Sequence, residues 1–225
     1  MERLTRRTCI TLGGLPVLAA LAGCGDSDSG VLEPPAAASA RERLQQLHLP
    51  NVPLITNEGE RVRFYDDLVK DKKVVLTFVS TRAPAWSAKV TQNLAALQWF
   101  FADRVGKDIL LYSISRTPRI DSPAALRTWA RRSAAGPGWR FLTGDPADVE
   151  RLRRSLGFAS DDAAEDADPA YSVGQLRYGV EPEMRWAHCA SQAPPRMLAH
   201  SMLLDFGPDA AQPQWNCDVA LAGLG

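Results

Sequence analysis

The chain has 225 residues, of which 45% are hydrophobic, and its 26 basic and 26 acidic side chains give a formal net charge of zero. A chain of this length and composition can bury the core of one domain. The balanced charge gives no clustered basic face of the kind that nucleic-acid binding requires, so no nucleic-acid partner is expected.

Residues 1–23 are predicted to be a lipoprotein signal peptide. A basic start with Arg3, Arg6 and Arg7 precedes a modestly apolar stretch at 10–22. That stretch contains glycine and proline and is shorter than the roughly 20 apolar residues that span a bilayer. The sequence Leu-Ala-Gly-Cys then indicates a lipobox, in which Cys24 is acylated and becomes the new N-terminus. Thr-Arg-Arg near the start also resembles a twin-arginine export signal, and an ordinary secretory signal with a chance arginine pair is the alternative.

Without residues 1–23, which hold three arginines and one glutamate, the chain has 23 basic and 25 acidic side chains, a formal charge of −2. This leaves no polybasic patch for a membrane surface, so attachment is expected to depend on the lipid. Residues 24–48 are predicted to be a flexible tether, rich in Gly, Ser, Pro and Ala over 26–39, with a short helical lead-in at 40–49. The tether would hold one domain, 49–225, on the periplasmic side of a bacterial membrane.

The first half of this domain is predicted to alternate strands and helices. A hairpin joins 53–56 to 61–64, and a helical turn follows at 66–69. The run 74–79 is continuously apolar, as in a strand that is buried on both faces of a sheet. A helix is expected over 87–105, because apolar residues recur on one helical face and Ser87 is a suitable N-cap.

The second half continues this alternation. It is predicted to contain a buried strand at 108–115, a helix from Ser122-Pro123 through Ala130, a short strand at 140–142 and a helix at 147–156 after Asp145-Pro146. A capping residue followed by proline is typical of helix starts. Strands that alternate with helices imply right-handed β–α–β units and a mainly parallel sheet. Two C-terminal strands, about 197–206 and 214–219, are expected to close the sheet antiparallel.

Residues 159–195 are predicted to be an inserted segment that caps one end of the sheet. An insertion of this length inside a compact domain often has a function. It begins with an acidic run, which is a solvated loop in most proteins and a metal site in a few. The acidic residues are Asp161, Asp162, Glu165, Asp166 and Asp168.

The junction at 81–87 reads Thr-Arg-Ala-Pro-Ala-Trp-Ser and follows the predicted strand 74–79. Thioredoxin-like proteins carry their reactive cysteines at such strand-to-helix junctions. The surroundings resemble the SCO/SenC family of copper-delivery and thiol-redox proteins, whose motif reads T-x-C-P-x-x-C-P. Pro84 matches this motif, but Ala83 and Ser87 occupy the cysteine positions. Neither residue can donate a thiolate to copper or form a disulfide.

Four further segments resemble the family in the same order. Residues 57–62 are similar to its D-G-x-x-V hairpin, and 141–144 to its F-L-T-G element. Residues 113–123 are similar to its S-I-S-x-D-P-x-x-D-T-P loop, with Thr117 in place of an aspartate. Residues 200–205 resemble the strand that carries the metal-binding histidine, which would be His200; alignment on Asp205 instead puts Met197 there. The resemblance covers 50–209 with one gap and implies a thioredoxin-like α/β fold.

Of the four cysteines, Cys9 leaves with the signal and Cys24 takes the lipid. Cys189 and Cys217 remain. Outside the cytoplasm, two remaining cysteines most often form one structural disulfide.

The resemblance implies copper as the candidate cofactor, because the family's Cu(I) site uses two thiolates and one imidazole. At that site the chain retains only His200, either as a weak ligand or as a core histidine held by a backbone hydrogen bond. No cofactor is expected at 81–87. The Met, Cys and His residues in the last third of the chain have two alternative interpretations. Either they form a relocated copper site, or the methionines fill the core and the two cysteines form a structural disulfide. The ligands of a relocated site would come from His188, Cys189, Met197, His200, Met202 and Cys217.

Trp86 lies between the former cysteine positions and is expected to be exposed, either as an anchor for a protein partner or as a cover over the emptied pocket. No nucleotide-binding, hydrolase or metalloprotease motif occurs, and a trio such as Ser87, His200 and Asp121 can be assembled in most proteins. The resemblance implies an accessory or assembly factor for a copper-containing or respiratory enzyme, and without the two cysteines we expect neither the family's Cu(I) and dithiol chemistry nor an enzymatic activity. The alternatives are a non-catalytic protein-interaction module and a thiol-redox protein that uses Cys189 and Cys217.

Overall fold

Seven strands form one mixed sheet in this computed structural model, which describes residues 39–81 and 84–207. The strand order is β2-β1-β5-β4-β3-β6-β7. The three central strands, β3 (Lys73–Val79), β4 (Ile109–Ser115) and β5 (Trp139–Thr143), are parallel. The outer strands pair antiparallel with their neighbours, and they are β1 (Pro53–Thr56), β2 (Arg61–Arg63), β6 (Gln175–Val180) and β7 (Arg185–Ala190). The predicted α/β class and the N-terminal hairpin are confirmed.

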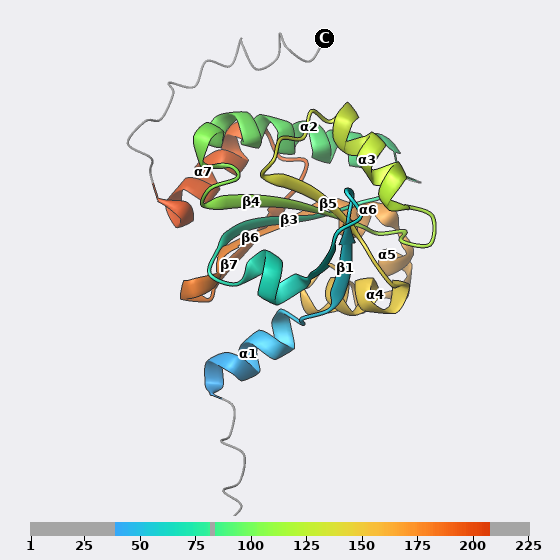
Figure 1. Cartoon of the computed structure of the whole chain (residues 1–225), viewed down its shortest axis with the longest axis horizontal. Coiled ribbons are helices and arrows are strands. Elements are labelled where there is room, and N and C mark those ends of the chain that lie inside the picture. The colour runs from blue at the N-terminus through green and yellow to red at the C-terminus, as the bar shows by residue number, and fades with distance from the viewer. Residues whose placement is uncertain (1–38, 82–83, 208–225) are drawn as a thin grey trace, which may run out of the picture. The chain divides into compact units, whose positions relative to one another are not determined.

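Helices cover both faces of the sheet (Figure 1). On one face lie α2 (Pro84–Phe101), α3 (Pro123–Arg132) and α7 (Pro195–Phe206), whose apolar residues share one core cluster. On the other face, α4 (Pro146–Ser155) and the π-helical turn η1 (Phe64–Val69) belong to a second cluster. Strand β3 supplies side chains to both clusters, which explains its continuous apolar run. Short 3₁₀ turns, η2 (Ala102–Arg104) and η3 (Glu181–Glu183), complete the connections.

Two helix starts follow the predicted capping pattern. The Ser122 hydroxyl accepts a hydrogen bond from the Ala125 amide (3.3 Å) at the start of α3. The Asp145 carboxylate accepts one from the Ala147 amide (2.8 Å) at the start of α4. Each helix has proline in its first turn, where the missing N–H would have no partner inside the helix.

The first described helix, α1 (Ala40–His48), is attached to the turn η3 by an ion pair between an exposed arginine and a buried glutamate. Arg41 Nη2 lies 2.8 Å from Oε1 of Glu181, whose side chain is completely buried. The Tyr65 hydroxyl (2.9 Å) and the Asp71 amide (2.8 Å) also donate to this carboxylate. The predicted signal, the lipid site Cys24 and the residues up to 38 lie outside the described residues. Within the described ranges, no helix is both long and apolar enough to cross a bilayer.

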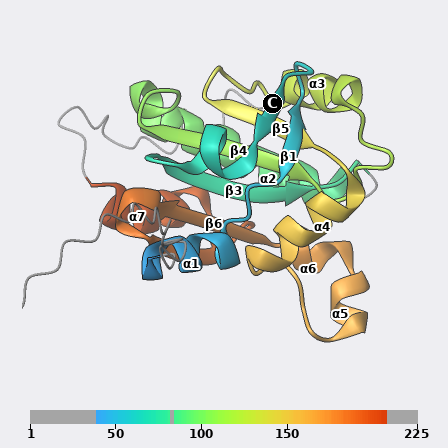
Figure 2. The same ribbon diagram turned by 60° about the horizontal axis from the view of Figure 1, so that its bottom comes forward.

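The inserted segment, 159–195, contains the two antiparallel strands that close the sheet, whereas the sequence predicted them at 197–206 and 214–219. It contains α5 (Ala163–Ala167), α6 (Pro169–Val173), β6 and β7, and Figure 2 shows the two short helices beside α4. Residues 197–206 form part of helix α7, so the strand predicted there is wrong. The physical reason is a helical spacing of apolar residues, since Leu198, Met202 and Phe206 are all buried on one side of α7. The strand predicted at 214–219 lies outside the described residues.

Candidate functional site

Ser87 closes the junction between β3 and α2. Helix α2 begins at Pro84, so the prediction of Ser87 as its N-cap is wrong. The Ser87 side chain is instead fully buried inside the first turns. Its Oγ donates to the Ser80 carbonyl (2.9 Å) and accepts from the Ser80 amide (2.8 Å). The hydroxyl at this former cysteine position therefore joins the helix to the end of the strand.

A buried carboxylate lies beside this junction. Asp121 has no exposed surface, and its Oδ2 accepts hydrogen bonds from the hydroxyls of Ser115 (2.6 Å) and Thr117 (2.8 Å). Its Oδ1 accepts a hydrogen bond from the Thr81 hydroxyl. Three hydroxyls from separate positions meet this one carboxyl group, so the cluster fixes the 117–121 loop against Thr81. The hydroxyl side chain of Thr117, at the family's aspartate position, belongs to the cluster.

Exposed apolar side chains flank the cluster. Trp86, in the first turn of α2, is 44% exposed, and Ile120 is 48% exposed; the predicted exposure of Trp86 is confirmed. The Thr81–Asp121 hydrogen bond joins the two segments that carry them. A shallow cavity of about 260 Å³ next to Ile120 is also lined by Pro118 and Arg119. We call Trp86, Pro118, Arg119 and Ile120 the loop face.

A second group of polar contacts holds the chain just before the loop face against α5 and α6. Arg116 directly precedes Thr117, and its guanidinium donates to the Asp166 carbonyl (2.9 Å) and the Ser172 hydroxyl (3.3 Å). Burial, and then the nearby Arg153 cation, lower the pKa of Arg116. Arg153 is itself 1% exposed. Sequence reasoning missed both arginines, because nothing in the local pattern marks a cation for burial.

His200 does not meet the junction. It lies on the exposed side of α7, whereas Met202 is buried on the other side, so the expected core histidine is wrong. Helix α7 runs alongside α2, since Asn93 binds the Ser191 carbonyl (2.7 Å) and the Phe101 and Phe206 rings are 6.0 Å apart.

The residues proposed for a relocated copper site point to different parts of the surface and core. His188 faces Phe158, with ring centroids 5.8 Å apart, on one side of β7, and Cys189 packs into the core on the other. Partial burial, and then Arg177, lower the pKa of His188. Met197 is 63% exposed. Among the described residues, no three His, Cys, Asp or Glu side chains are grouped to hold a metal.

Cys189 is partly buried, and burial raises the pKa of its thiol to about 11. A thiol with such a pKa is almost wholly protonated at neutral pH and is a poor nucleophile. Cys217 lies outside the described residues, so the Cys189–Cys217 disulfide stays a prediction.

No protein-family model matches the chain, and no curated protein matches it in sequence. Solved structures do match it in fold. A copper-bound ScoI of Arabidopsis thaliana is 20% identical with a TM-score of 0.53, over 68% of this chain and 94% of that one. A copper-bound ScoI of Bradyrhizobium japonicum is 19% identical with a TM-score of 0.52, over 67% and 94%. A SCO1/SenC family lipoprotein of Bacillus anthracis is 18% identical with a TM-score of 0.55, over 67% and 90%.

The protein has the Sco fold. This confirms the predicted thioredoxin-like architecture. Within this fold, the first turn of α2 carries Ser87 where the SCO/SenC motif has a cysteine, and the Ser87 hydroxyl is used in contacts to Ser80.

Proposed function

We propose that this protein is a SCO/SenC-like accessory or assembly factor for a copper-containing or respiratory enzyme, and that it works by binding a protein partner. The proposal rests on the residues at the junction between β3 and α2. The chain has the Sco fold, yet Ala83 and Ser87 stand at the two cysteine positions of the motif, and the Ser87 hydroxyl is hydrogen-bonded to the Ser80 backbone. A Cu(I) site depends on soft thiolate ligands, and this junction supplies none.

We further propose that the protein is lipid-anchored through Cys24 on the periplasmic side of a bacterial membrane. The lipobox ahead of Cys24 and the Gly-, Ser-, Pro- and Ala-rich stretch after it support this.

The loop face is the surface that we assign to the partner. Trp86 and Ile120 expose apolar area on segments that the buried Asp121 holds in place. Tryptophan is enriched among residues that dominate interface energy, and an anchor with a fixed position loses little entropy on binding. Arg119 adds an exposed cation at the edge of this face.

The double variant Trp86→Ala/Ile120→Ala tests this assignment. In a strain that lacks the protein, we expect the membrane activity of the copper-containing oxidase to fall several-fold, native protein to restore it, and the double variant to fail. Both side chains are exposed, so the cost in stability should stay within about 1 kcal/mol. Trp99→Ala, which changes a tryptophan 42% exposed near the far end of α2, is the matched control and should restore activity. Full restoration by the double variant at native abundance would remove the loop face from the proposal.

The raised pKa of Cys189 argues against the thiol-redox alternative. We expect titration of the mature protein to find no free thiol from Cys189 and Cys217, and mild reductant to leave the pair oxidised, as for structural disulfides. Two free thiols, or a couple that reduces readily near the potentials of known oxidoreductases, would favour the redox function instead.

A further inference from the structure

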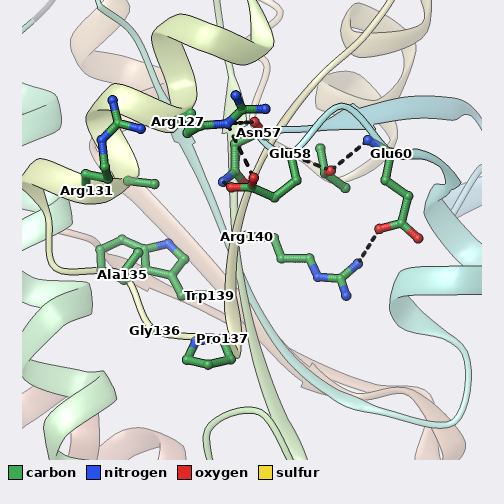
Figure 3. Close-up of a pocket in the computed structure, with 12 residues that line it drawn as sticks. Asn57, Glu58, Glu60, Arg127, Arg131, Ala135, Gly136, Pro137, Trp139 and Arg140 are labelled. Carbon is green, nitrogen blue, oxygen red and sulfur yellow. Dashed lines mark hydrogen bonds and ion pairs between the residues drawn. The ribbon is translucent and has the colours of Figure 1, made fainter.

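A cleft lies between the β1–β2 turn, α3 and the start of β5 (Figure 3). Its volume is about 420 Å³, within the usual range of ligand pockets. None of the residues of the loop face lines it. The residues that line it are Thr56, Asn57, Glu58, Glu60, Arg127, Ala130, Arg131, Ala135, Gly136, Pro137, Trp139 and Arg140.

Two arginines of the cleft, Arg127 and Arg131, keep unused hydrogen-bond donors within the described residues. Arg127 uses its Nε toward the Asn57 carbonyl (3.1 Å) and Glu58 (3.3 Å), which leaves both terminal amino groups without a partner among the described residues. Arg131 has one contact, to the Thr128 hydroxyl at 3.3 Å, and no carboxylate partner within the described ranges. A guanidinium with free terminal groups can bind a carboxylate through two parallel hydrogen bonds.

The ion pairs that now occupy the cleft are weak. Arg127 and Glu58 are 3.3 Å apart with side chains 41% and 68% exposed, and Arg140 and Glu60 are also 3.3 Å apart with side chains 46% and 61% exposed. Exposed pairs of this kind contribute between zero and about 1 kcal/mol. With three arginines and two glutamates, the cleft carries one excess positive charge. An incoming carboxylate can therefore replace Glu58 or Glu60 at little cost.

The floor of the cleft is rigid. Trp139 is 3% exposed and its Nε1 donates to the Ser113 hydroxyl (3.0 Å). Asn57 is paired with Phe141 in both directions: its side-chain oxygen accepts from the Phe141 amide (3.0 Å), and its own amide donates to the Phe141 carbonyl (2.8 Å). The cleft therefore exists before a ligand arrives, which lowers the entropy cost of binding.

We propose that this cleft binds an acidic segment of a protein partner. Aspartate or glutamate side chains of that segment would bind the free groups of Arg127 and Arg131, and the segment would lie against the apolar floor. Five of the lining residues are exposed, among them Glu58, Glu60 and Arg140. A ligand here stays open to solvent on one side, whereas pockets for small molecules cover most of the ligand.

The test uses the full chain and a fluorescein-labelled peptide of alternating glutamate and glycine, with affinity measured by fluorescence anisotropy at low and physiological salt. We expect Arg131→Gln to weaken binding about tenfold, the effect of one lost charge-assisted contact. Arg132→Gln is the matched control, since Arg132 is the next residue of α3, is exposed and does not line the cleft. It should change affinity by no more than about twofold, the effect of a distant screened charge.

A second pair of variants tests whether removal of a glutamate that competes for the cleft arginines strengthens peptide binding. Glu58→Gln frees Arg127 and should tighten peptide binding about fivefold. Glu183→Gln removes an exposed glutamate that is also paired with an arginine, at 2.8 Å from Arg185, outside the cleft, and should have little effect. Equal effects of Arg131→Gln and Arg132→Gln, or of the two glutamate variants, would overturn the proposal. So would displacement of the peptide by succinate or phosphate at equal concentration, because the site would then be one for small anions. Trp86→Ala/Ile120→Ala should leave peptide binding unchanged, which separates this cleft from the loop face.

Discussion

Replacement of Arg153 by methionine is expected to lower the free energy of unfolding by about 3–5 kcal/mol, the usual cost of breaking a buried ion pair by removing one partner. Arg153 is 1% exposed. The terminal nitrogens of its guanidinium bind the two oxygens of Asp166 at 2.6 Å each. Its Nε and Nη2 bind Glu150 at 2.9 Å, and Nη1 also reaches the Phe158 carbonyl at 3.0 Å. Methionine would fill the space and leave the Asp166 carboxylate without its main partner.

The matched control is Arg154→Met. Arg154 pairs with the same two carboxylates, at 2.7 Å from Glu150 and 3.6 Å from Asp166, but its side chain is 57% exposed. An exposed pair contributes at most about 1 kcal/mol, so urea unfolding should show a much smaller loss for this variant. Equal losses for the two variants would show that burial of Arg153 adds nothing. Hydrogen exchange over 159–173 should quicken in Arg153→Met, because Arg153 joins α4 to α5 and α6 through Asp166 and Ser172.

The contacts of Arg153 with Asp166 and Glu150 predict that the stability of the fold depends on pH. Hydrogen bonds from Arg153 lower the pKa of Asp166 well below its usual range and also lower the pKa of Glu150. A carboxylate whose pKa is depressed in the folded state stabilises the fold above its unfolded pKa, and that stabilisation is lost as the pH falls toward the folded value. The unfolding free energy of the native protein should therefore drop below about pH 5. In Arg153→Met this acid-side slope should be shallower, and an unchanged slope would show that the ion pair does not control acid stability.

Local patterns in the sequence predicted the framework of the fold well. Strands β3 and β4 are predominantly apolar and buried, and Ser122 and Asp145 with their following prolines locate two helix starts. Helix α7 was the main error. Its own residues indicate a helix, with Pro195 in the first turn and Leu198 and Met202 four apart. The strand expected there follows from the SCO/SenC resemblance around His200, whereas the spacing of apolar residues indicates the helix.

The site could be predicted only in part, for a physical reason. The loss of both cysteines and the exposure of Trp86 follow from residue types and position alone. The other contacts join segments that are distant in the sequence. The hydroxyl of Thr81 binds Asp121, and the buried Arg153 binds Asp166. Burial of Arg153 is stable only because two carboxylates and the Phe158 carbonyl meet it. No local pattern contains that information.

The native mature protein is not expected to retain stoichiometric Cu(I) against a moderate chelator. Ser87 offers only a hydroxyl that is bonded to Ser80, and His200 lies on the outer side of α7. The double variant Ala83→Cys/Ser87→Cys restores both thiolates of the family motif, and these soft ligands dominate Cu(I) affinity. We expect it to retain about one Cu(I) per chain under conditions in which native protein retains only background copper.

Measurements in a background where Cys189 and Cys217 are replaced by alanine confine the copper to the new thiols. The single variant Ser87→Cys is the matched control, and with one thiolate it should lose Cu(I) to the chelator. Stoichiometric retention by native protein that survives loss of Cys189 and Cys217, but not His200→Ala, would contradict the prediction and identify a copper centre at the histidine. Background binding by the double variant would show that the two Sco cysteine positions are not restored by residue identity alone.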